Sequence, residues 1–373
     1  MHRALIMCWL LAACSGESAQ PSPQATAGQP AAGTPAASTA GTSAGPDAAM
    51  AGRAAMGGAG AAGMPAPSAG RPAAGSGGAP GTVEDDAGTP GAAGTGAAGS
   101  PGAMQGPPTG PFPPVTSFTA PGPFSGTMLA NTGPGNNFTI HLPSELAKNG
   151  VKNPVVAWMS GGGTDPSLYP LLPLLATHGF VVLASNTVPG IGAELELGKE
   201  LTAALDWATA ENVRQGSMFF GKLDTTKLAA MGYSMGSLAT FAMASDPRLT
   251  TTVHISGGNM VADRVNNLRA PAAFLCGIPN PSCTNLLADD CDIAAANCDI
   301  DFMNAKTPVF YGNFPGGHLG ILTPPNQERI HAEVVAWLRW QLMADTTLKA
   351  RFVGPDCGVC KDANWKVKQK NLQ

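Results

Sequence analysis

The sequence predicts an α/β fold, with a mainly parallel central sheet and helices on both faces. Short continuous apolar runs, typical of buried parallel strands, alternate with longer segments of helical periodicity from about residue 138 to residue 343. A Gly-x-Ser-x-Gly pentapeptide at residues 232–236 stands between one such strand and the next helix. Alternating strands and helices favour a parallel sheet that is covered on both sides.

The first half of this region begins with an expected strand at residues 138–142. Residues 155–159 form a continuous apolar run suited to a buried strand, and a glycine-rich loop follows it. Residues 169–178 have helical spacing, and Gly179 stands where a helix should stop. Residues 180–184 are again apolar throughout, which indicates a second buried strand.

The second half continues the alternation. Residues 191–210 carry leucines at helical spacing among charged side chains, which predicts an amphipathic helix. The closing helix, at residues 327–343, places tryptophans on or near its buried side. Between them we expect strands at residues 227–231, 251–255, 271–276 and 308–311, and a helix of small residues at 237–244.

The N-terminal residues 1–14 are typical of a signal peptide and not of a folded element. A positive start, Met1-His2-Arg3, precedes an apolar stretch that is too short to span a bilayer as a lasting helix. Leu11-Ala12-Ala13-Cys14 resembles the lipobox of bacterial lipoproteins, which implies cleavage before Cys14 and lipidation of its thiol. We therefore expect an exported lipoprotein at an outer membrane or cell surface, touching the membrane only through its lipid; the alternative is a plain secretory signal.

Residues 15–114 are almost entirely Ala, Gly, Pro, Ser and Thr. Such a composition offers almost no large apolar side chain whose burial could offset the entropy of ordering, so we expect a disordered linker. Residues 115–373 are sufficient for one well-cored domain, and we expect it to be a monomer.

Six cysteines follow the leader, and in an exported protein an even number predicts three disulfides. Fifteen connectivities are possible, although local pairing suits Cys357-Gly-Val-Cys360. A Cys-x-x-Cys in a polar C-terminal tail favours a structural staple over a redox motif, and no second Cys-x-x-Cys supports a zinc site. The six are Cys276, Cys283, Cys291, Cys298, Cys357 and Cys360.

The chain has a formal net charge of −4 and only 12% charged residues, so it does not have the basic surface of a nucleic-acid-binding protein. The basic cluster at residues 361–370 lacks interleaved aromatic residues and is expected to be a solvated tail. No metal or organic cofactor is expected.

Ser234 is the candidate nucleophile, at the centre of the Gly232-to-Gly236 pentapeptide. A sharp strand-to-helix turn needs glycines there, because side chains would clash with the neighbouring backbone, and the turn exposes the hydroxyl. The alternative interpretation is a glycine-bounded turn with an ordinary serine.

A nucleophilic serine needs a histidine base, and in an α/β-hydrolase an acid lies between the two in chain order. Of six histidines, only His318 and His331 come late enough. His318 lies in a glycine-rich loop after a strand, whereas His331 lies within a predicted helix. A base must reach the nucleophile from such a loop, so we favour His318.

The acid should lie on the loop after the strand at residues 271–276, where it would hold the imidazole tautomer. That loop carries several aspartates, most of which suit a solvated acidic loop. The oxyanion requires backbone donors: the amide of Met235 and one from the loop Ser160-Gly-Gly-Gly-Thr164. The candidate aspartates of the loop after the strand at residues 271–276 are Asp289, Asp290, Asp292, Asp299 and Asp301.

Four segments together resemble the dienelactone-hydrolase-like and cutinase-like polyester hydrolases, which are α/β-hydrolases. They are Met159–Thr164, Thr177–Ala184, Gly232–Gly236 and Gly317-His318, within a resemblance that covers about residues 151–342. The resemblance implies an oxyanion amide at Gly163. It also implies an acid two residues before Ile293-Ala294, and this position is Cys291. Asp290 or Asp292 must therefore take the role of the acid, and Asp290 is preferred.

The sequence also departs from this family. Polyester hydrolases commonly hold a tryptophan where this chain has Ser256-Gly-Gly258, and an aromatic residue where it has Gly163. Both departures predict an open cleft with small walls.

The expected function is serine-dependent hydrolysis of carboxylic esters through an acyl-enzyme, with a small-molecule or polymeric ester as substrate. Two alternatives remain: a non-catalytic binding protein on the same fold, and a hydrolase or acyltransferase acting on another acyl bond.

Overall fold

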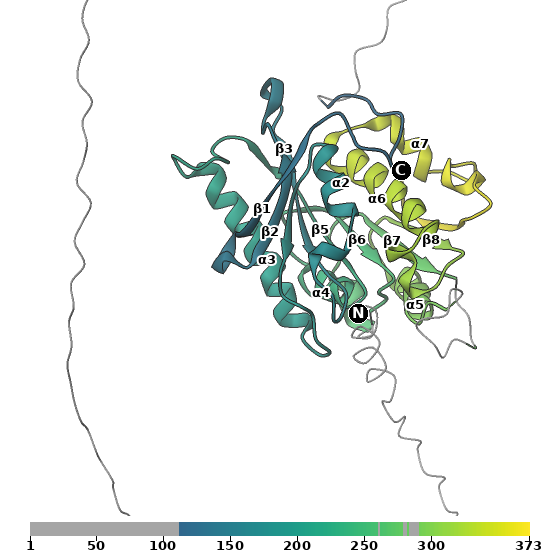
Figure 1. Ribbon diagram of the computed structural model, residues 1–373. Coiled ribbons are helices and arrows are strands. Elements are labelled where there is room, and N and C mark those ends of the chain that lie inside the picture. The colour runs from purple at the N-terminus through teal and green to yellow at the C-terminus, as the bar shows by residue number, and fades with distance from the viewer. Residues whose placement is uncertain (1–111, 260–261, 279–281, 283–290) are drawn as a thin grey trace, which may run out of the picture. The chain divides into compact units, whose positions relative to one another are not determined.

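The computed structural model describes residues 112–259, 262–278, 282 and 291–373 (Figure 1). The expected signal peptide, the lipidation residue Cys14 and nearly all of the expected linker lie outside these residues. Within them, nine strands form one sheet in the order β1-β2-β4-β3-β5-β6-β7-β8-β9. The strands are β1 (Gly126–Thr132), β2 (Phe138–Pro143), β3 (Asn153–Met159), β4 (Val181–Ser185), β5 (Leu223–Tyr233), β6 (Leu249–Ile255), β7 (Ala272–Gly277), β8 (Val309–Phe314) and β9 (Lys366–Lys370).

The centre of the sheet is parallel and its edges are antiparallel. Strands β4, β3, β5, β6, β7 and β8 pair in parallel. Strands β1 and β2 add antiparallel pairs at one edge, and β9 adds one at the other. The expected mainly parallel sheet is therefore confirmed. Because the central strands are parallel, their carboxyl ends lie side by side at one end of the sheet, called here its carboxyl edge. Loops can bring side chains together there.

Helices cover both faces of the sheet (Figure 1). Alternate residues of β3 point to opposite faces: Val156 packs in one hydrophobic cluster with residues of α2 and α6, and Val155 packs in another with residues of α3. This alternation follows from the two-residue period of a strand. The α-helices that cover the sheet are α2 (Leu171–Thr177), α3 (Glu194–Val213), α4 (Met235–Met243), α5 (Ala295–Asn304) and α6 (Asn326–Met343), and a short α7 (Lys349–Phe352) follows.

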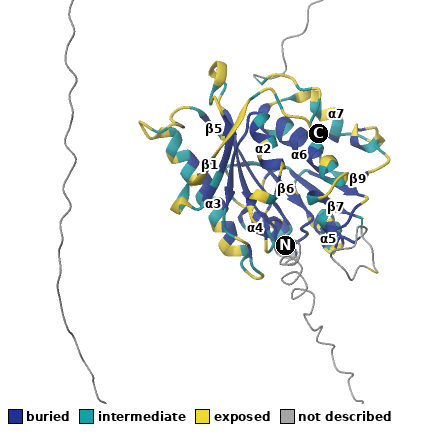
Figure 2. Ribbon diagram, in the orientation of Figure 1, coloured by how far each residue is buried: buried dark blue, intermediate teal, exposed yellow. Residues whose placement is uncertain are grey.

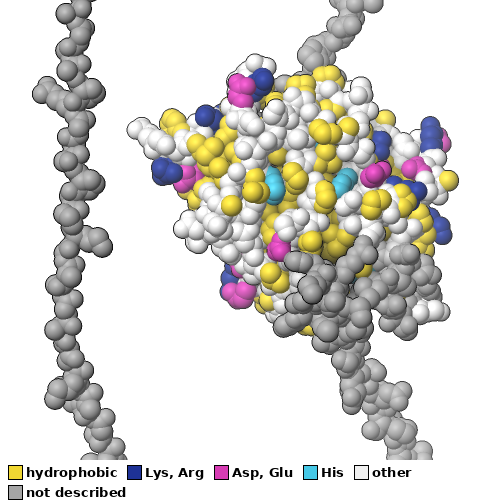
Figure 3. Space-filling view, in the orientation of Figure 1, with side chains coloured by type: hydrophobic (Ala, Val, Ile, Leu, Met, Phe, Trp, Pro, Cys, Tyr) yellow, Lys and Arg dark blue, Asp and Glu magenta, His cyan; other side chains and the backbone are white. Residues whose placement is uncertain are grey.

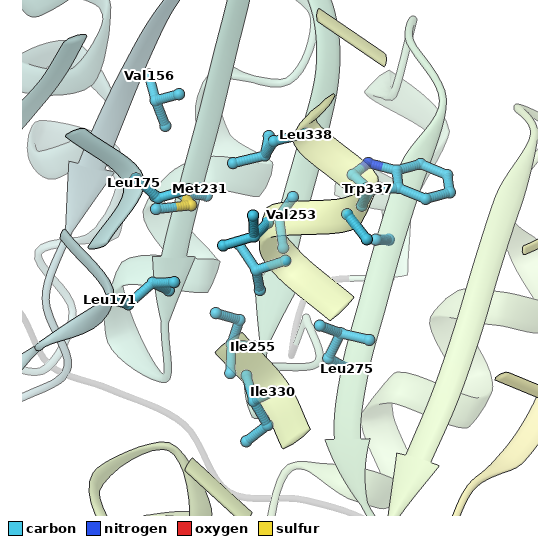
Figure 4. Close-up of a cluster of buried hydrophobic side chains, with 14 of the residues drawn as sticks. Val156, Leu171, Leu175, Met231, Val253, Ile255, Leu275, Ile330, Trp337 and Leu338 are labelled. Atoms are coloured by element: carbon cyan, nitrogen blue, oxygen red, sulfur yellow. The ribbon is translucent and has the colours of Figure 1, made fainter. Parts of the chain in front are cut away.

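The core lies between the sheet and its helices, and Figure 2 shows the buried strands at the centre. Figure 4 shows Trp337 and Leu338 of α6 among side chains from the central strands, including Val253 and Leu275. The indole Nε1 of Trp337 donates a hydrogen bond to Thr251 Oγ1 at 2.8 Å, so its one polar atom is satisfied inside the core. None of the described helices is both long and apolar enough to cross a bilayer.

The C-terminal basic segment is not a solvated tail, contrary to the expectation from sequence. Residues Lys366–Lys370 form β9, which pairs with β8. The Nζ of Lys370 donates hydrogen bonds to the carbonyls of Phe302 and Met303 at 2.6 and 2.7 Å, at the end of α5. A cation is favourable at a helix C-terminus because the last carbonyls lack partners within the helix. On the face in Figure 3, several Lys and Arg side chains lie along the side that the C-terminal segment occupies.

The disulfides join the C-terminal half of the domain. Cys357 pairs with Cys360, as expected, and Cys276 of β7 pairs with Cys298 of α5. Cys291 is also disulfide-bonded. The Cys276–Cys298 bond holds α5 against β7. Because α5 contains Asp299 and Asp301, part of the segment that was expected to be an acidic loop is a helix.

Candidate active site

Ser234 lies at the turn between β5 and α4, at the carboxyl edge of the sheet. Its backbone has φ 54° and ψ −116°, a conformation that side-chain-bearing residues rarely adopt. The Ser234 amide donates to the carbonyl of Ile255 at 2.9 Å, which holds the turn on β6. Strained backbone of this kind occurs at functional sites, where the surrounding structure enforces it.

The glycines on either side of Ser234 are required by close packing. A Cβ atom on Gly232 would overlap the backbone of Gly236, and a Cβ on Gly236 would overlap the carbonyl of Met159. These contacts are with backbone atoms, which cannot rotate away. The pentapeptide is thus a tight elbow that presents a half-buried serine.

His318 joins Ser234 to Asp292. Its Nε2 lies 2.9 Å from Ser234 Oγ, and its Nδ1 lies 2.9 Å from Asp292 Oδ1. The imidazole is only 2% exposed and follows β8, where its own amide donates to the carbonyl of Cys291 at 2.8 Å. Both ring nitrogens are therefore engaged, in the arrangement of a serine, histidine and acid triad.

Asp292 is held as a carboxylate. Its Oδ2 accepts a hydrogen bond from the Gly277 amide at 2.7 Å, and its Oδ1 accepts one from the Ala294 amide at 3.0 Å. Burial opposes ionisation of this side chain, but the hydrogen bond and charge of His318, together with the two amides, bring the pKa of Asp292 below its usual value. The charged form is thus favoured beside the imidazole.

The preference for Asp290 as the acid needs correction. Asp290 lies outside the described residues, but the hydrogen bond expected of it, to His318 Nδ1, is made by Asp292. A ring N–H has one hydrogen, and Asp292 already accepts it at good length. The physical reason is the pair of amides of Gly277 and Ala294, which fix the Asp292 carboxylate beside His318.

The other candidates lie elsewhere. His331 lies within α6 and is 6% exposed, and burial lowers its pKa to about 4. Asp299 pairs with Lys368 at 2.7 Å, and Asp301 accepts a hydrogen bond from the Asn259 amide. None of these three contacts Ser234 or His318. Asp289 lies outside the described residues.

The Gly163 amide, in the glycine-rich loop after β3, is not free to donate a hydrogen bond to an oxyanion. That amide donates to the carbonyl of Pro189 at 3.1 Å, so its hydrogen is already used. The Gly161 amide likewise donates to Tyr169 Oη at 3.0 Å. The assignment of Gly163 as an oxyanion donor is therefore wrong, because a long-range contact fixes its amide.

Gly162 is the residue of this loop that remains available. Its amide makes no hydrogen bond to another described residue. A Cβ on Gly162 would lie 3.2 Å from Met235 Cγ, so this loop position adjoins the residue after the nucleophile. The Gly162 and Met235 amides are the pair suited to hold an oxyanion.

Tyr233 also supports the site, and the sequence analysis missed it. Its hydroxyl donates to the carbonyl of His318 at 2.8 Å, and its ring lies 5.3 Å from the imidazole. The only signal in the sequence was its place beside Ser234 in the elbow. Because Tyr233 is 3% exposed, it acts as a buried support for the loop that carries the imidazole.

The fold and the site define an α/β-hydrolase. Residues 103–288 match the family described as PET hydrolase-like. This span contains Ser234 and ends before Asp292 and His318, which the structure joins to it. The chain belongs to the PET hydrolase-like family of α/β-hydrolases.

Two curated relatives illustrate the similarity. A bis(hydroxyethyl) terephthalate hydrolase of Streptomyces coelicolor is 32% identical over 158 residues, which are 40% of this chain and 49% of the relative. Cutinase est1 of Thermobifida alba is 32% identical over 107 residues, which are 29% of this chain and 34% of the relative. The similarity thus spans a third to a half of these proteins.

Proposed function

We propose that the protein is a serine hydrolase of carboxylic esters that works through an acyl-enzyme. The observation that carries the proposal is the continuous pair of contacts from Ser234 through His318 to Asp292, each 2.9 Å long. The names of the relatives, a terephthalate diester hydrolase and a cutinase, support an ester as the bond cleaved.

In the proposed reaction, Ser234 Oγ attacks the ester carbonyl carbon while His318 Nε2 takes the hydroxyl proton. The resulting imidazolium is stabilised by Asp292, whose carboxylate is already charged. When the tetrahedral intermediate collapses, His318 gives its proton to the departing alcohol, and the acyl group stays on Ser234. Water, activated by the same imidazole, then releases the acid.

The oxyanion that forms in both steps needs donors aimed at it before the reaction. We propose the amides of Met235 and Gly162 for this role. Met235 begins α4, where the first amides of the helix have no partners within the helix. The Gly162 loop is held by Tyr169, whose hydroxyl bonds the Gly161 amide and lies 2.6 Å from Thr164 Oγ1. Such preorganised donors contribute about 3–4 kcal/mol each to the transition state.

The packing near Ser234 favours aliphatic over aromatic esters. A Cβ on Gly258 would overlap the backbone of Asn297 and Cys298, so no side chain fits at this position. Helix α5, fixed by the Cys276–Cys298 disulfide, fills that space. An aromatic side chain that could stack on a substrate ring is thereby excluded from residue 258, and we propose aliphatic esters as the preferred substrates.

The experiment that tests the function compares the wild type with Ser234→Ala on p-nitrophenyl butyrate and with a fluorophosphonate probe. We expect turnover and labelling in the wild type and neither in the variant, with an unchanged melting temperature. Folded wild-type protein that takes no label would instead favour a binding function, and turnover of amides over esters would favour another acyl bond.

We also propose that the enzyme is exported and anchored through Cys14. The sequence of residues 11–14 supports this proposal. Cys14→Ser should abolish metabolic labelling of the protein with a fatty-acid probe without changing its specific activity. Labelling that persists in Cys14→Ser would contradict the lipid anchor.

A further inference from the structure

The Cys357–Cys360 disulfide has an unusual setting for a structural bond. Cys360 lines a surface cavity of about 520 Å³, together with Gly354, Pro355, Val367 and Gln369. Cys357, in contrast, is 1% exposed and packs in the hydrophobic core. One sulfur-bearing residue therefore faces a space large enough for a small organic molecule, whereas its partner is sealed.

We propose that Cys357–Cys360 is a thiol-exchange site, which takes low-molecular-weight thiols at Cys360. The entering thiolate attacks Cys360 Sγ and forms a new sulfur–sulfur bond. The Cys357–Cys360 bond breaks, and Cys357 leaves as a thiolate that takes up a proton. A second thiol then attacks the mixed disulfide, so that two small thiols are oxidised to a disulfide and the protein pair is reduced.

Hydrogen bonds around the two sulfurs fit this direction of attack. The Cys360 amide donates to Cys357 Sγ at 3.0 Å, where negative charge develops on the leaving sulfur. An N–H aimed at a thiolate favours the charged form. The Gln369 amide group donates to Cys360 Sγ at 3.3 Å and so holds the attacked sulfur at the cavity wall.

The two disulfides differ in how open they are to a thiol in solution. Cys276 and Cys298 are 0% and 2% exposed and lie in one hydrophobic cluster, whereas Cys360 is half-buried at the cavity wall. Exchange requires the attacking thiolate to reach a disulfide sulfur. We therefore expect a small thiol to open Cys357–Cys360 well before it opens Cys276–Cys298.

Other contacts keep this region in place when the bond opens. The Gly354 amide donates to Gln369 Oε1, and Gln369 Nε2 donates back to the Gly354 carbonyl, both at 2.9 Å. Trp365 is 5% exposed, and β9 pairs with β8. Opening the pair should therefore leave the domain folded and its esterase site intact.

The test uses the full chain and glutathione as the probe thiol. The wild type is incubated with excess reduced glutathione, free thiols are trapped with N-ethylmaleimide at successive times, and peptides are read by mass spectrometry. We expect alkylation at Cys357 and Cys360 under conditions in which Cys276 and Cys298 stay paired. Reduction of both pairs at the same rate, or of Cys276–Cys298 first, would overturn the proposal.

Two variants locate the attacked sulfur. With oxidised glutathione, Cys357→Ser should form a glutathione adduct on Cys360, whereas Cys360→Ser should leave Cys357 unmodified. An adduct on Cys357 alone would overturn the assignment. The wild-type measurement does not depend on the folding of either variant. Ser234→Ala should undergo thiol exchange like the wild type. Failure of the ester hydrolase proposal can therefore be distinguished from failure of the thiol-exchange proposal.

Discussion

The Gly277 amide donates to Asp292 Oδ2 at 2.7 Å, while the other oxygen of the same carboxylate faces His318. Gly277 ends β7, so the sheet itself orients the acid of the site. A Cβ on Gly277 would overlap the Gly316 carbonyl, so the loops after β7 and β8 pack closely here. The acid and the base are thus fixed by adjacent strands and not by a flexible connection.

Asp292→Asn should lower kcat by about 10³- to 10⁴-fold, because an amide cannot stabilise the imidazolium and favours the wrong tautomer. Hydrolysis of p-nitrophenyl butyrate at pH 7 measures this. Asp299→Asn is the matched control, since Asp299 pairs with the half-exposed Lys368 and should keep near-wild-type turnover. A larger loss for Asp299→Asn than for Asp292→Asn would contradict the proposed acid.

His318→Ala should reduce turnover about as severely as Ser234→Ala, because both remove the same proton transfer. His331→Gln is its control: His331 is buried in α6, and its Nε2 has no partner among the described residues. This control should lose stability at most, with turnover per folded molecule unchanged. Comparable losses in the two histidine variants, normalised by fluorophosphonate labelling, would move the base away from His318.

The elbow and the base could be predicted from the sequence because their signals are local. The glycines around Ser234 and the loop position of His318 each follow from a few neighbouring residues. Chain order then excluded most other histidines. The parallel sheet was predictable for the same reason, since its strands are continuous apolar runs.

The remaining parts of the site depend on contacts between distant residues. The residues near Gly163 do not indicate that its amide donates to the Pro189 carbonyl. The sequence therefore did not distinguish Gly163 from Gly162 as the oxyanion donor. The sequence did not distinguish Asp292 from Asp290, because the contact with His318 depends on how the chain after β7 folds. Strand β9 was missed because lysines suggest solvent, whereas Lys370 in fact binds carbonyls at the end of α5.

Asp301 should make stability depend on pH. Burial raises its pKa to about 7, above the value of about 3.9 for an unfolded chain, so between these values the folded state holds a proton that unfolding releases. Stability contributed by this group is full below pH 4 and declines as pH rises to about 7. The fall in melting temperature from pH 5 to pH 8 should therefore be smaller in Asp301→Asn; an equal fall would contradict the raised pKa.

The Cys276–Cys298 disulfide should contribute more stability than Cys357–Cys360. From loop length alone, the first is worth about 3 kcal/mol and the second about 2 kcal/mol. Guanidinium unfolding of Cys298→Ala and Cys360→Ala, each paired with alanine at its partner, compares them. A greater loss for the Cys357–Cys360 double variant would show that contacts other than loop closure dominate.

Gly258→Ala should damage both stability and turnover, because the added methyl group meets the backbone of α5 at Cys298 and cannot rotate away. Overpacking of this kind costs about 1–3 kcal/mol. The neighbouring Gly257 lies against the Ser234 carbonyl, so a shift of this loop should also disturb the elbow and lower kcat more than it raises KM. Gly190→Ala is the matched control, since an added Cβ there meets nothing within 4 Å. Thermal unfolding and p-nitrophenyl butyrate kinetics of the two variants test the packing. If Gly258→Ala matches Gly190→Ala in both melting temperature and turnover, α5 moves to accommodate a side chain at residue 258. The proposed preference for aliphatic esters would then lose its structural basis.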